Sequence, residues 1–296
     1  PWTTVPGCCC RDRPARATLA ITAGSRYELY ANGQYIGRGP ARSAPHHQSF
    51  DVVDLTPALR AGENALAIRV HRQREEVSYY DSSRGGLLAQ LDAGSVQLQT
   101  DAAWRVAPDR SWLNAAPRMA RFHLEVCDRV DLRLGMGAWT GVAFDDRGWA
   151  PARVLRRENG WPLPQENDRP GSLIDPWTAL VRREIPLLKE SVSPAGPPVQ
   201  VSSVRAPRLT EEGWSGAAAI ARLPVIRSGG AGSIIPTNVA GECRVLTYDL
   251  GEVQNGRPFL DIQAPAGTVV DVMAAPYLMA GTLVSPIVAS SYVDRI

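Results

Sequence analysis

An Asn-Gly pair between two alternating segments is the feature that most restricts the fold of this chain. Asn32 and Gly33 separate residues 27–31 from residues 34–38, and in both segments apolar or aromatic residues alternate with polar ones. Asn-Gly supplies the two positive-φ positions of a type I′ turn, whose twist matches that of paired antiparallel strands. The sequence therefore predicts a β-hairpin over residues 27–38.

Short strand-like segments separated by turn residues continue on both sides of this hairpin. After it, strands are expected at residues 49–53, 64–71, 86–92, 95–99 and 103–107. Turn signals every 8–12 residues or so are typical of an antiparallel sandwich or jelly roll. We therefore expect an all-β first module over residues 16–155, preceded by a terminal segment, residues 1–15, that is open to fraying.

The part of the chain after residue 155 divides into a connector and a second strand-rich region. Residues 156–198 are rich in Pro, Arg and Trp, and proline at this density blocks both helix and central strand. Strands are expected again from residue 199, at 243–250, 257–264 and 267–275, with turns at 255–256 and 265–267. The second antiparallel β-sandwich would thus cover residues 199–296, and we expect it to be incomplete at its C-terminal side because its last strand would be an unpaired edge.

Composition removes several classes of function. The net charge is only +2 and the 32 basic residues are spread along the chain, which disfavours a nucleic-acid partner. No apolar run approaches the roughly 18 residues of a membrane span, so no membrane partner is expected. The chain begins with Pro1 and shows no signal-peptide pattern, so localisation is not set by the sequence.

Cysteines and carboxylates give no strong sign of a metal site or a hydrolytic centre. Cys127 and Cys243 are expected to be small buried side chains, while the triplet at residues 8–10 has no assigned role. Neighbouring carboxylates such as Asp145 and Asp146 point to opposite faces of an extended chain, so they do not converge on one glycosidic bond. For this pair a turn that buries Trp149 is favoured over calcium coordination, and no cofactor is expected.

Several motifs together resemble one enzyme family. Residues 27–42, the segment 50–56 and the Ala-Gly-Glu-Asn turn at residues 61–64 look like the N-terminal domain of α-L-rhamnosidases of glycoside hydrolase family 78, a galactose-binding-like jelly roll. Residues 125–128, 144–152 and 182–188 are similar, in order and spacing, to the bridge between the two sandwiches of rhamnosidase-like enzymes. The runs 248–251, 256–258 and 264–270 resemble the start of the second sandwich.

The resemblance implies a function for the parent protein that this chain does not carry alone. The family's catalytic (α/α)₆ barrel, which holds the two carboxylic acids that cleave the bond with inversion, is absent from this sequence. We therefore expect a non-catalytic accessory region, carbohydrate-binding or scaffolding, of a bacterial enzyme that removes terminal α-L-rhamnose. Its partners would be a rhamnose-containing glycan and the missing barrel of the same polypeptide, and the resemblance favours an extracellular or periplasmic location.

One loop combines the side chains that usually grip a sugar. Aromatic faces and planar hydrogen-bonding groups occur together in residues 77–86, which end in two glycines. A second candidate contact is a pair of histidines in the loop after the first hairpin. The expected carbohydrate-binding residues are Tyr79, Tyr80, Asp81, Arg84, His46 and His47, and the alternative for both stretches is a plain connection between strands.

Two other classes of protein remain open from the sequence. The hairpin and the Ala-Gly-Glu-Asn turn also occur in N-terminal sandwiches of β-galactosidase-type glycosidases, so the chain could be the sugar-binding sandwich of such an enzyme. It could also be a structural or adhesive β-sandwich without a sugar role. The order of the later motifs favours the rhamnosidase-like interpretation over both.

Overall fold

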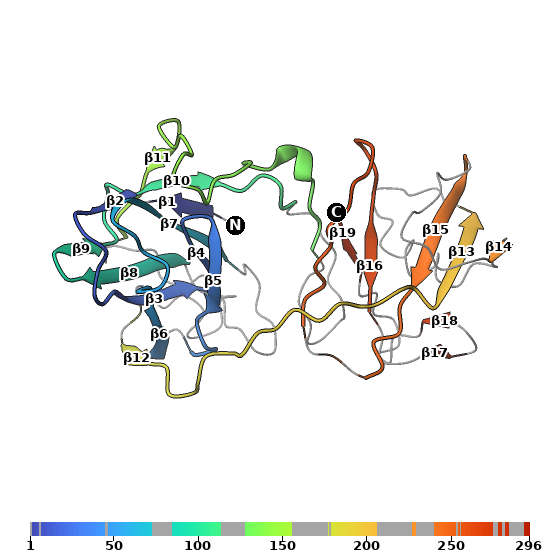
Figure 1. Ribbon diagram of the computed structural model, residues 1–296, viewed down its shortest axis with the longest axis horizontal. Coiled ribbons are helices and arrows are strands. Elements are labelled where there is room, and N and C mark those ends of the chain that lie inside the picture. The colour runs from blue at the N-terminus through green and yellow to red at the C-terminus, as the bar shows by residue number, and fades with distance from the viewer. Residues whose placement is uncertain are drawn as a thin grey trace, which may run out of the picture. The chain divides into compact units, whose positions relative to one another are not determined.

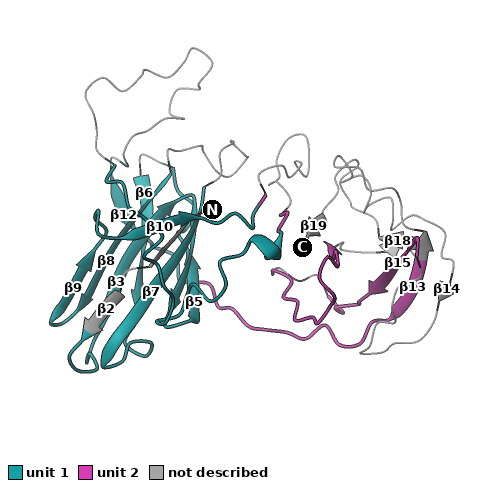
Figure 2. Ribbon diagram, turned by 90° about the horizontal axis from the view of Figure 1, so that it is seen from above, with its two compact units in different colours: residues 1–112, 131–187 teal, residues 113–130, 188–296 magenta. Residues whose placement is uncertain are grey.

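A computed structural model describes two compact units of the chain. The residues described are 2–5, 7–44, 47–72, 85–113, 128–155, 177, 179–205, 227–228, 240–252, 254, 256–274, 278–279, 282–283 and 293–296. The first unit comprises residues 1–112 and 131–187, and the second comprises residues 113–130 and 188–296 (Figure 2). Each unit has its own sheets.

The described residues of the first unit form twelve strands in two sheets. The seven-stranded sheet has the order β11-β10-β1-β7-β4-β5 with β2 also on β7, and the five-stranded sheet has the order β12-β6-β3-β8-β9 (Figure 1). The strands are β1 (Trp2–Val5), β2 (Gly7–Cys10), β3 (Thr18–Gly24), β4 (Arg26–Ala31), β5 (Gln34–Gly39), β6 (Gln48–Asp54), β7 (Gly62–His71), β8 (Gly86–Ala93), β9 (Val96–Gln99), β10 (Arg105–Pro108), β11 (Ala150–Pro151) and β12 (Leu180–Arg182).

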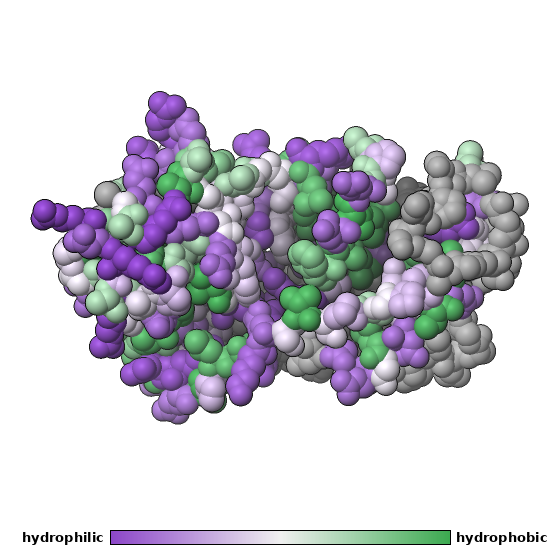
Figure 3. All heavy atoms as spheres, viewed as in Figure 1, coloured by the Kyte–Doolittle hydropathy of each residue, from purple (hydrophilic) through white to green (hydrophobic). Residues whose placement is uncertain are grey.

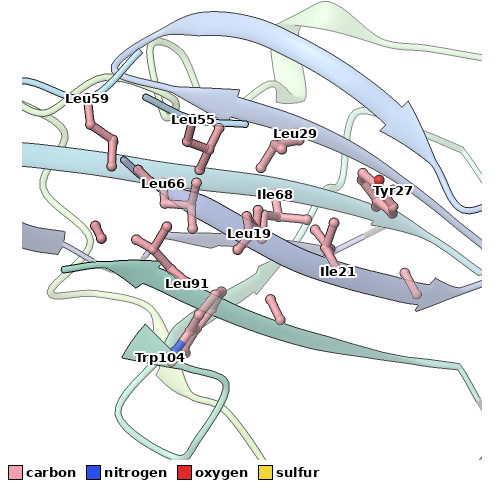
Figure 4. Packing of buried hydrophobic residues seen from close by; sticks show 14 of the residues in the cluster. Leu19, Ile21, Tyr27, Leu29, Leu55, Leu59, Leu66, Ile68, Leu91 and Trp104 are labelled. Carbon is pink, nitrogen blue, oxygen red and sulfur yellow. The ribbon is translucent and has the colours of Figure 1, made fainter. Parts of the chain in front are cut away.

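The two sheets enclose one hydrophobic core. Alternate residues of β3, β4, β7 and β8 face inward, as the two-residue period of a strand requires. Figure 4 shows the buried side chains, with others from outside these strands such as Leu59, as a row between the strands, with Tyr27 at one end and Leu59 at the other. Leu19, Leu29, Ile68 and Leu91 are among the fully buried members, so the module is a β-sandwich.

The predicted hairpin is confirmed. Strand β4 pairs antiparallel with β5, and the turn has φ of 53° at Asn32 and 84° at Gly33, both in the left-handed region. Strands β6 to β10 correspond, within a few residues at their ends, to the strands predicted at 49–53, 64–71, 86–92, 95–99 and 103–107. Turn chemistry and alternation therefore predicted the central strands correctly.

The structure differs from the sequence interpretation at the edges of the first sandwich. Residues 2–5 and 7–10, within the segment described above as open to fraying, form β1 and β2, and these pair with different parts of β7. Strand β12 comes from the expected connector and lies parallel to β6, so the five-stranded sheet is not purely antiparallel. The strand forms in a stretch without proline, between Pro176 and Pro186, so the proline-rich composition of the connector does not prevent it.

The second unit contains smaller antiparallel sheets. A three-stranded sheet has the order β14-β13-β15, and two pairs are β16 with β19 and β17 with β18. Their bounds are β13 (Gln200–Arg205), β14 (Arg227–Ser228), β15 (Glu242–Thr247), β16 (Asp271–Met273), β17 (Leu278–Met279), β18 (Thr282–Leu283) and β19 (Val293–Arg295). The strand expected at 257–264 does not form: these residues are irregular and exposed, with Pro258 inside the segment and Pro265 directly after it.

The all-β class predicted from the sequence is confirmed. The helical structure in the described part of the chain is the 3₁₀ turn Leu132–Leu134, and no helix there is long and apolar enough to cross a membrane. On the face shown in Figure 3, hydrophobic residues of the first unit are interspersed with long hydrophilic side chains, as is usual for a surface in contact with water.

Candidate functional site

The first sandwich has one end, here called the loop end, at which both predicted sugar-contacting loops begin. Strands β3, β5 and β7 finish there, and strands β4, β6, β8 and β12 start there. The pairings that establish this are Gly24 with Gly86, Arg26 with His71, Tyr27 with Gly39, and Leu180 with Gln48. The loop between β5 and β6 and the loop between β7 and β8 therefore emerge at the same end of the module.

Most of the predicted sugar-contacting residues lie outside the described part of the chain. This holds for Tyr79, Tyr80, Asp81 and Arg84 in the β7–β8 loop and for His46 in the β5–β6 loop. His47 is described and is exposed, and its backbone N–H donates to the carbonyl of Ala44 at 2.9 Å. What the structure adds is the common end from which the two loops start.

The β7–β8 loop starts and ends at a tight contact. Gly85 has a φ of +79°, and a side-chain carbon there would come within 2.7 Å of Arg72 Cδ. Glycine is needed here for both reasons, because other residues rarely adopt this φ and the neighbouring Arg72 leaves no room. The first and last residues of the loop are thus held against each other.

Buried polar side chains form a floor beneath the loop end. The Gln48 side-chain amide donates to Thr22 Oγ1 at 2.9 Å, and the Thr22 hydroxyl donates to the carbonyl of Ser49 at 2.6 Å. The Ser49 backbone N–H donates to Ser43 Oγ at 2.8 Å, which ties the β5–β6 loop to the start of β6. Hydrogen-bonded burial of this kind makes the floor rigid.

A buried charged group lies next to this floor. Asp51 is fully buried and accepts hydrogen bonds from the Tyr27 hydroxyl at 2.5 Å and from the Arg183 guanidinium at 3.0 Å. The side chain of Arg183 is only 8% exposed. Burial and the adjacent carboxylate raise the pKa of Tyr27 above its usual value, so its hydroxyl is a donor to Asp51.

The outer face of the seven-stranded sheet carries an aromatic and charged cluster. The Arg69 guanidinium lies 6.0 Å from the centroid of Trp112 and 5.4 Å from that of Trp139, within cation–π range. It also pairs with Glu28 at 3.1 Å and with Asp109 at 3.3 Å. The two carboxylates balance the charge of Arg69, although its buried Nε makes no hydrogen bond to a described residue, and these contacts hold Asp109, Trp112 and Trp139 on the sheet.

His71 adjoins the same cluster at the loop end of β7. Its imidazole packs edge-on against Trp112 with centroids 5.5 Å apart. Burial, together with neighbouring positive groups that include Arg26 and Arg69, lowers the pKa of His71 to about 4. The imidazole is therefore neutral near pH 7 and able to donate and accept hydrogen bonds.

The segment predicted to be a turn that buries Trp149 forms a turn, and Trp149 is partly buried in it. Trp149 packs edge-on against Phe144 with centroids 5.3 Å apart, and both join the cluster around Trp139. Asp145 pairs with the Arg147 guanidinium at 2.6 Å, which lowers the pKa of Asp145 to about 2. Across the described ranges, no group of three or more His, Cys, Asp or Glu residues is placed to hold a metal ion.

Sequence reasoning missed the Asp51–Arg183 pair and the polar floor. The two charged residues are 132 positions apart, and nothing local to either one indicates the other. A usable signal was the aspartate at an inward position of the predicted strand 49–53, because a core-facing carboxylate needs a partner. Cys243, expected to be buried, is half-buried, while Cys127 lies outside the described residues.

The comparison with protein-family models decides the family. The model of the alpha-L-rhamnosidase N-terminal domain matches residues 12–170, more than half of the chain. This chain belongs to that family. The recognition drawn from the sequence motifs is thereby confirmed, and the chain is a rhamnosidase-related region.

Solved structures similar to this family member are α-L-rhamnosidases. A GH78 family rhamnosidase of Bacillus sp. GL1 is 34% identical, with a TM-score of 0.57 over 74% of this chain and 22% of the other. The Streptomyces avermitilis alpha-L-rhamnosidase complexed with L-rhamnose is 18% identical, with a TM-score of 0.60 over 99% of this chain and 24% of the other. The enzyme from Aspergillus terreus, also 18% identical, has a TM-score of 0.52 over 99% and 29%.

The matched rhamnosidases are much longer than this chain. It spans between a fifth and a third of the length of each of them. The two similarities at 18% identity show the fold alone. A search of curated proteins gave no match.

Proposed function

We propose that this chain is a non-catalytic accessory region of an α-L-rhamnosidase-like glycoside hydrolase that removes terminal α-L-rhamnose from glycans or glycosides. The remaining part of such an enzyme, the catalytic (α/α)₆ barrel, would supply the cleaving carboxylic acids. Within the described residues, the adjacent pair Asp145 and Asp146 does not suit this chemistry, because Asp145 is engaged by Arg147. The chain by itself is therefore a binding or scaffolding region.

We further propose that the loop end of the first sandwich contacts the carbohydrate. The observation that carries this proposal is topological: the loop with Tyr79, Tyr80, Asp81 and Arg84 and the loop with His46 and His47 start at the same end of the module. Aromatic faces stack on the apolar face of a sugar, while Asp and Arg side chains bond its hydroxyl groups. The rigid floor of Thr22, Gln48 and Ser49 favours such a site, because a fixed base lowers the entropy lost on binding.

The affinity of this site for a single sugar is expected to be weak. A monosaccharide offers few apolar atoms, and its hydroxyl groups exchange water for protein partners with little net gain in free energy. Binding at millimolar L-rhamnose is therefore the relevant range. No metal ion is part of the proposal.

A titration with L-rhamnose followed by ¹H–¹⁵N chemical shifts tests the proposal. The double change Tyr79→Ala and Tyr80→Ala should abolish the rhamnose-dependent shifts and leave the spectrum dispersed. Tyr248→Ala, which removes an exposed tyrosine from the second unit, is the matched control and should leave the shifts unchanged. If the wild-type protein shows no shifts, or the double variant shows the same shifts, the loop is a plain connection and the region is a scaffold.

A further inference from the structure

A charged contact joins the start of the sandwich to a segment far along the chain. Strand β12 runs parallel to β6, and the hydrogen bonds Gln48 N–H to Ala179 carbonyl and Arg183 N–H to Phe50 carbonyl, both 2.9 Å, flank it. Arg182 and Arg183 are neighbours, but Arg182 is exposed whereas the side chain of Arg183 is 8% exposed and reaches Asp51. The alternation of side chains along an extended chain explains this difference.

Asp51 depends on Arg183 for its charge balance. Its carboxylate is fully buried, and among the described residues Arg183 is the one cation that contacts it. The Tyr27 hydroxyl occupies the other carboxylate oxygen. Removing one partner of such a buried pair leaves an uncompensated charge in a medium of low dielectric constant, which is strongly destabilising.

The same carboxylate supports the beginning of the β5–β6 loop. A side-chain carbon at Gly39, the last residue of β5, would lie 1.9 Å from Asp51 Oδ2 and 2.8 Å from the Tyr27 hydroxyl oxygen. The backbone at Gly39 therefore rests directly on the ion pair. The other end of this loop is held by the Ser49 to Ser43 hydrogen bond, two residues before Asp51.

We propose that Arg183 is a latch: its ion pair with Asp51 seats residues 179–183 on the first sandwich and fixes residues 40–44, the described start of the β5–β6 loop, at the loop end. The family match ends at residue 170, before this latch. On this proposal, residues 179–183 belong to the first sandwich although they lie beyond the family match. The chain leaves the first unit at residue 187, only four residues after the latch.

Hydrogen–deuterium exchange on the full chain tests the latch with a matched pair of variants. Arg183→Met should raise the exchange rate at least about tenfold at the amides of Gln48 and of residue 183, whose hydrogen bonds flank β12, and at the Ser49 amide, which bonds Ser43 of the loop. Arg182→Met, changed at the exposed neighbour, should leave these rates as in the wild type. Equal exchange in the two variants would overturn the proposal.

A second variant keeps the test decisive if Arg183→Met does not fold. In Asp51→Asn/Arg183→Met no charge remains buried, so the protein should fold and should still show fast exchange over residues 179–183. Wild-type protection of this segment in the double variant would show that the ion pair does not hold it. If the double variant does not fold, the unfolding of Arg183→Met is not caused by the unpaired charge of Asp51. This result would also refute the latch.

An effect of the latch on carbohydrate binding rests on the proposed function of the loop end. If that function holds, Arg183→Met should weaken rhamnose-dependent shifts severalfold, while Arg182→Met should not. If the wild-type protein shows no such shifts, the proposed function fails, and the exchange rates of the variants still decide the latch.

Discussion

The side-chain amide of Asn32 donates a hydrogen bond of 2.9 Å to the side-chain oxygen of Asn64. Two sequence motifs, the Asn-Gly turn and the Ala-Gly-Glu-Asn turn, are thus joined by one contact between the turn after β4 and the start of β7. Asn64 also accepts from the Arg60 N–H at 3.0 Å and donates to the carbonyl oxygens of Arg60 at 2.8 Å and Gly62 at 3.0 Å. Its side chain is buried and holds the turn before β7 closed.

Replacing this asparagine should destabilise the first sandwich. Asn64→Ala removes one of the two hydrogen bonds of the Asn32 amide, which still donates to the Ala58 carbonyl, and leaves several backbone groups of the turn without their partner, at a cost of about 2–3 kcal/mol. Glu63→Ala, at the exposed neighbouring position, should change stability by less than about 0.5 kcal/mol. Urea unfolding followed by the fluorescence of tryptophan, including the buried Trp104, measures both, and equal midpoints for the two variants would refute this role of Asn64.

A methyl group at Gly39 should be poorly tolerated. It would collide with the Asp51 carboxylate and the Tyr27 hydroxyl, so Gly39→Ala should lower the free energy of unfolding by about 2–3 kcal/mol. Gly37→Ala, two residues earlier on β5, meets no atom within 4 Å and is the matched control. Similar stability of the two variants in thermal unfolding would show that the buried pair has room to move.

Acid should weaken the first sandwich through His71. Its pKa is about 4 in the folded protein and near 6.5 in the unfolded chain, so the unfolded chain binds more protons between these values. Stability therefore falls as the pH is lowered from about 6.5 to 4, by up to about 3 kcal/mol, with no contribution above that range. His71→Gln should flatten this dependence, whereas His47→Gln, at an exposed position, should not. Unfolding curves from pH 7 to pH 4 that coincide in slope for wild type and His71→Gln would contradict this.

The isolated chain should not hydrolyse aryl α-L-rhamnosides. Inversion needs two carboxyl groups about 6.5–9.5 Å apart across a sugar pocket, and the proposed function assigns them to the catalytic barrel and not to this region. A release assay with purified chain measures this directly. Turnover that is abolished by changing a single Asp or Glu would show that the chain is an enzyme in its own right.

Local chemistry explains why the central part of the fold was predictable from the sequence. The hairpin at Asn32 and Gly33 depends on two residues and their neighbours, and the structure has it as expected. Strand β12 was not expected, because its formation depends on a partner, β6, about 130 residues earlier. The strand predicted at residues 257–264 from the alternation of apolar and polar residues was wrong. A strand also needs a neighbouring strand to pair with, and a local pattern does not provide one.

For the candidate site, the sequence could suggest which residue types would contact a sugar, but not where the fold would place them. Tyr79, Tyr80, Asp81 and Arg84 suit a sugar by their chemistry, and that interpretation stays a prediction. The convergence of their loop with the His47 loop follows from strand order, which single-sequence patterns do not fix. The buried partners of Asp51 come from β4 and from the segment after β12, so they too required the fold.

The location of rhamnose-dependent shifts in an assigned ¹H–¹⁵N spectrum tests the central claim most directly. We predict shifts for amides at the loop end, at residues 22–24, 47–49, 71–72 and 85–86. We predict none at the opposite end of the same sandwich, at the turns around Asn32, Gly62 and Gly94. Shifts confined to the opposite end, or an absence of shifts at millimolar L-rhamnose, would contradict a carbohydrate-binding loop end.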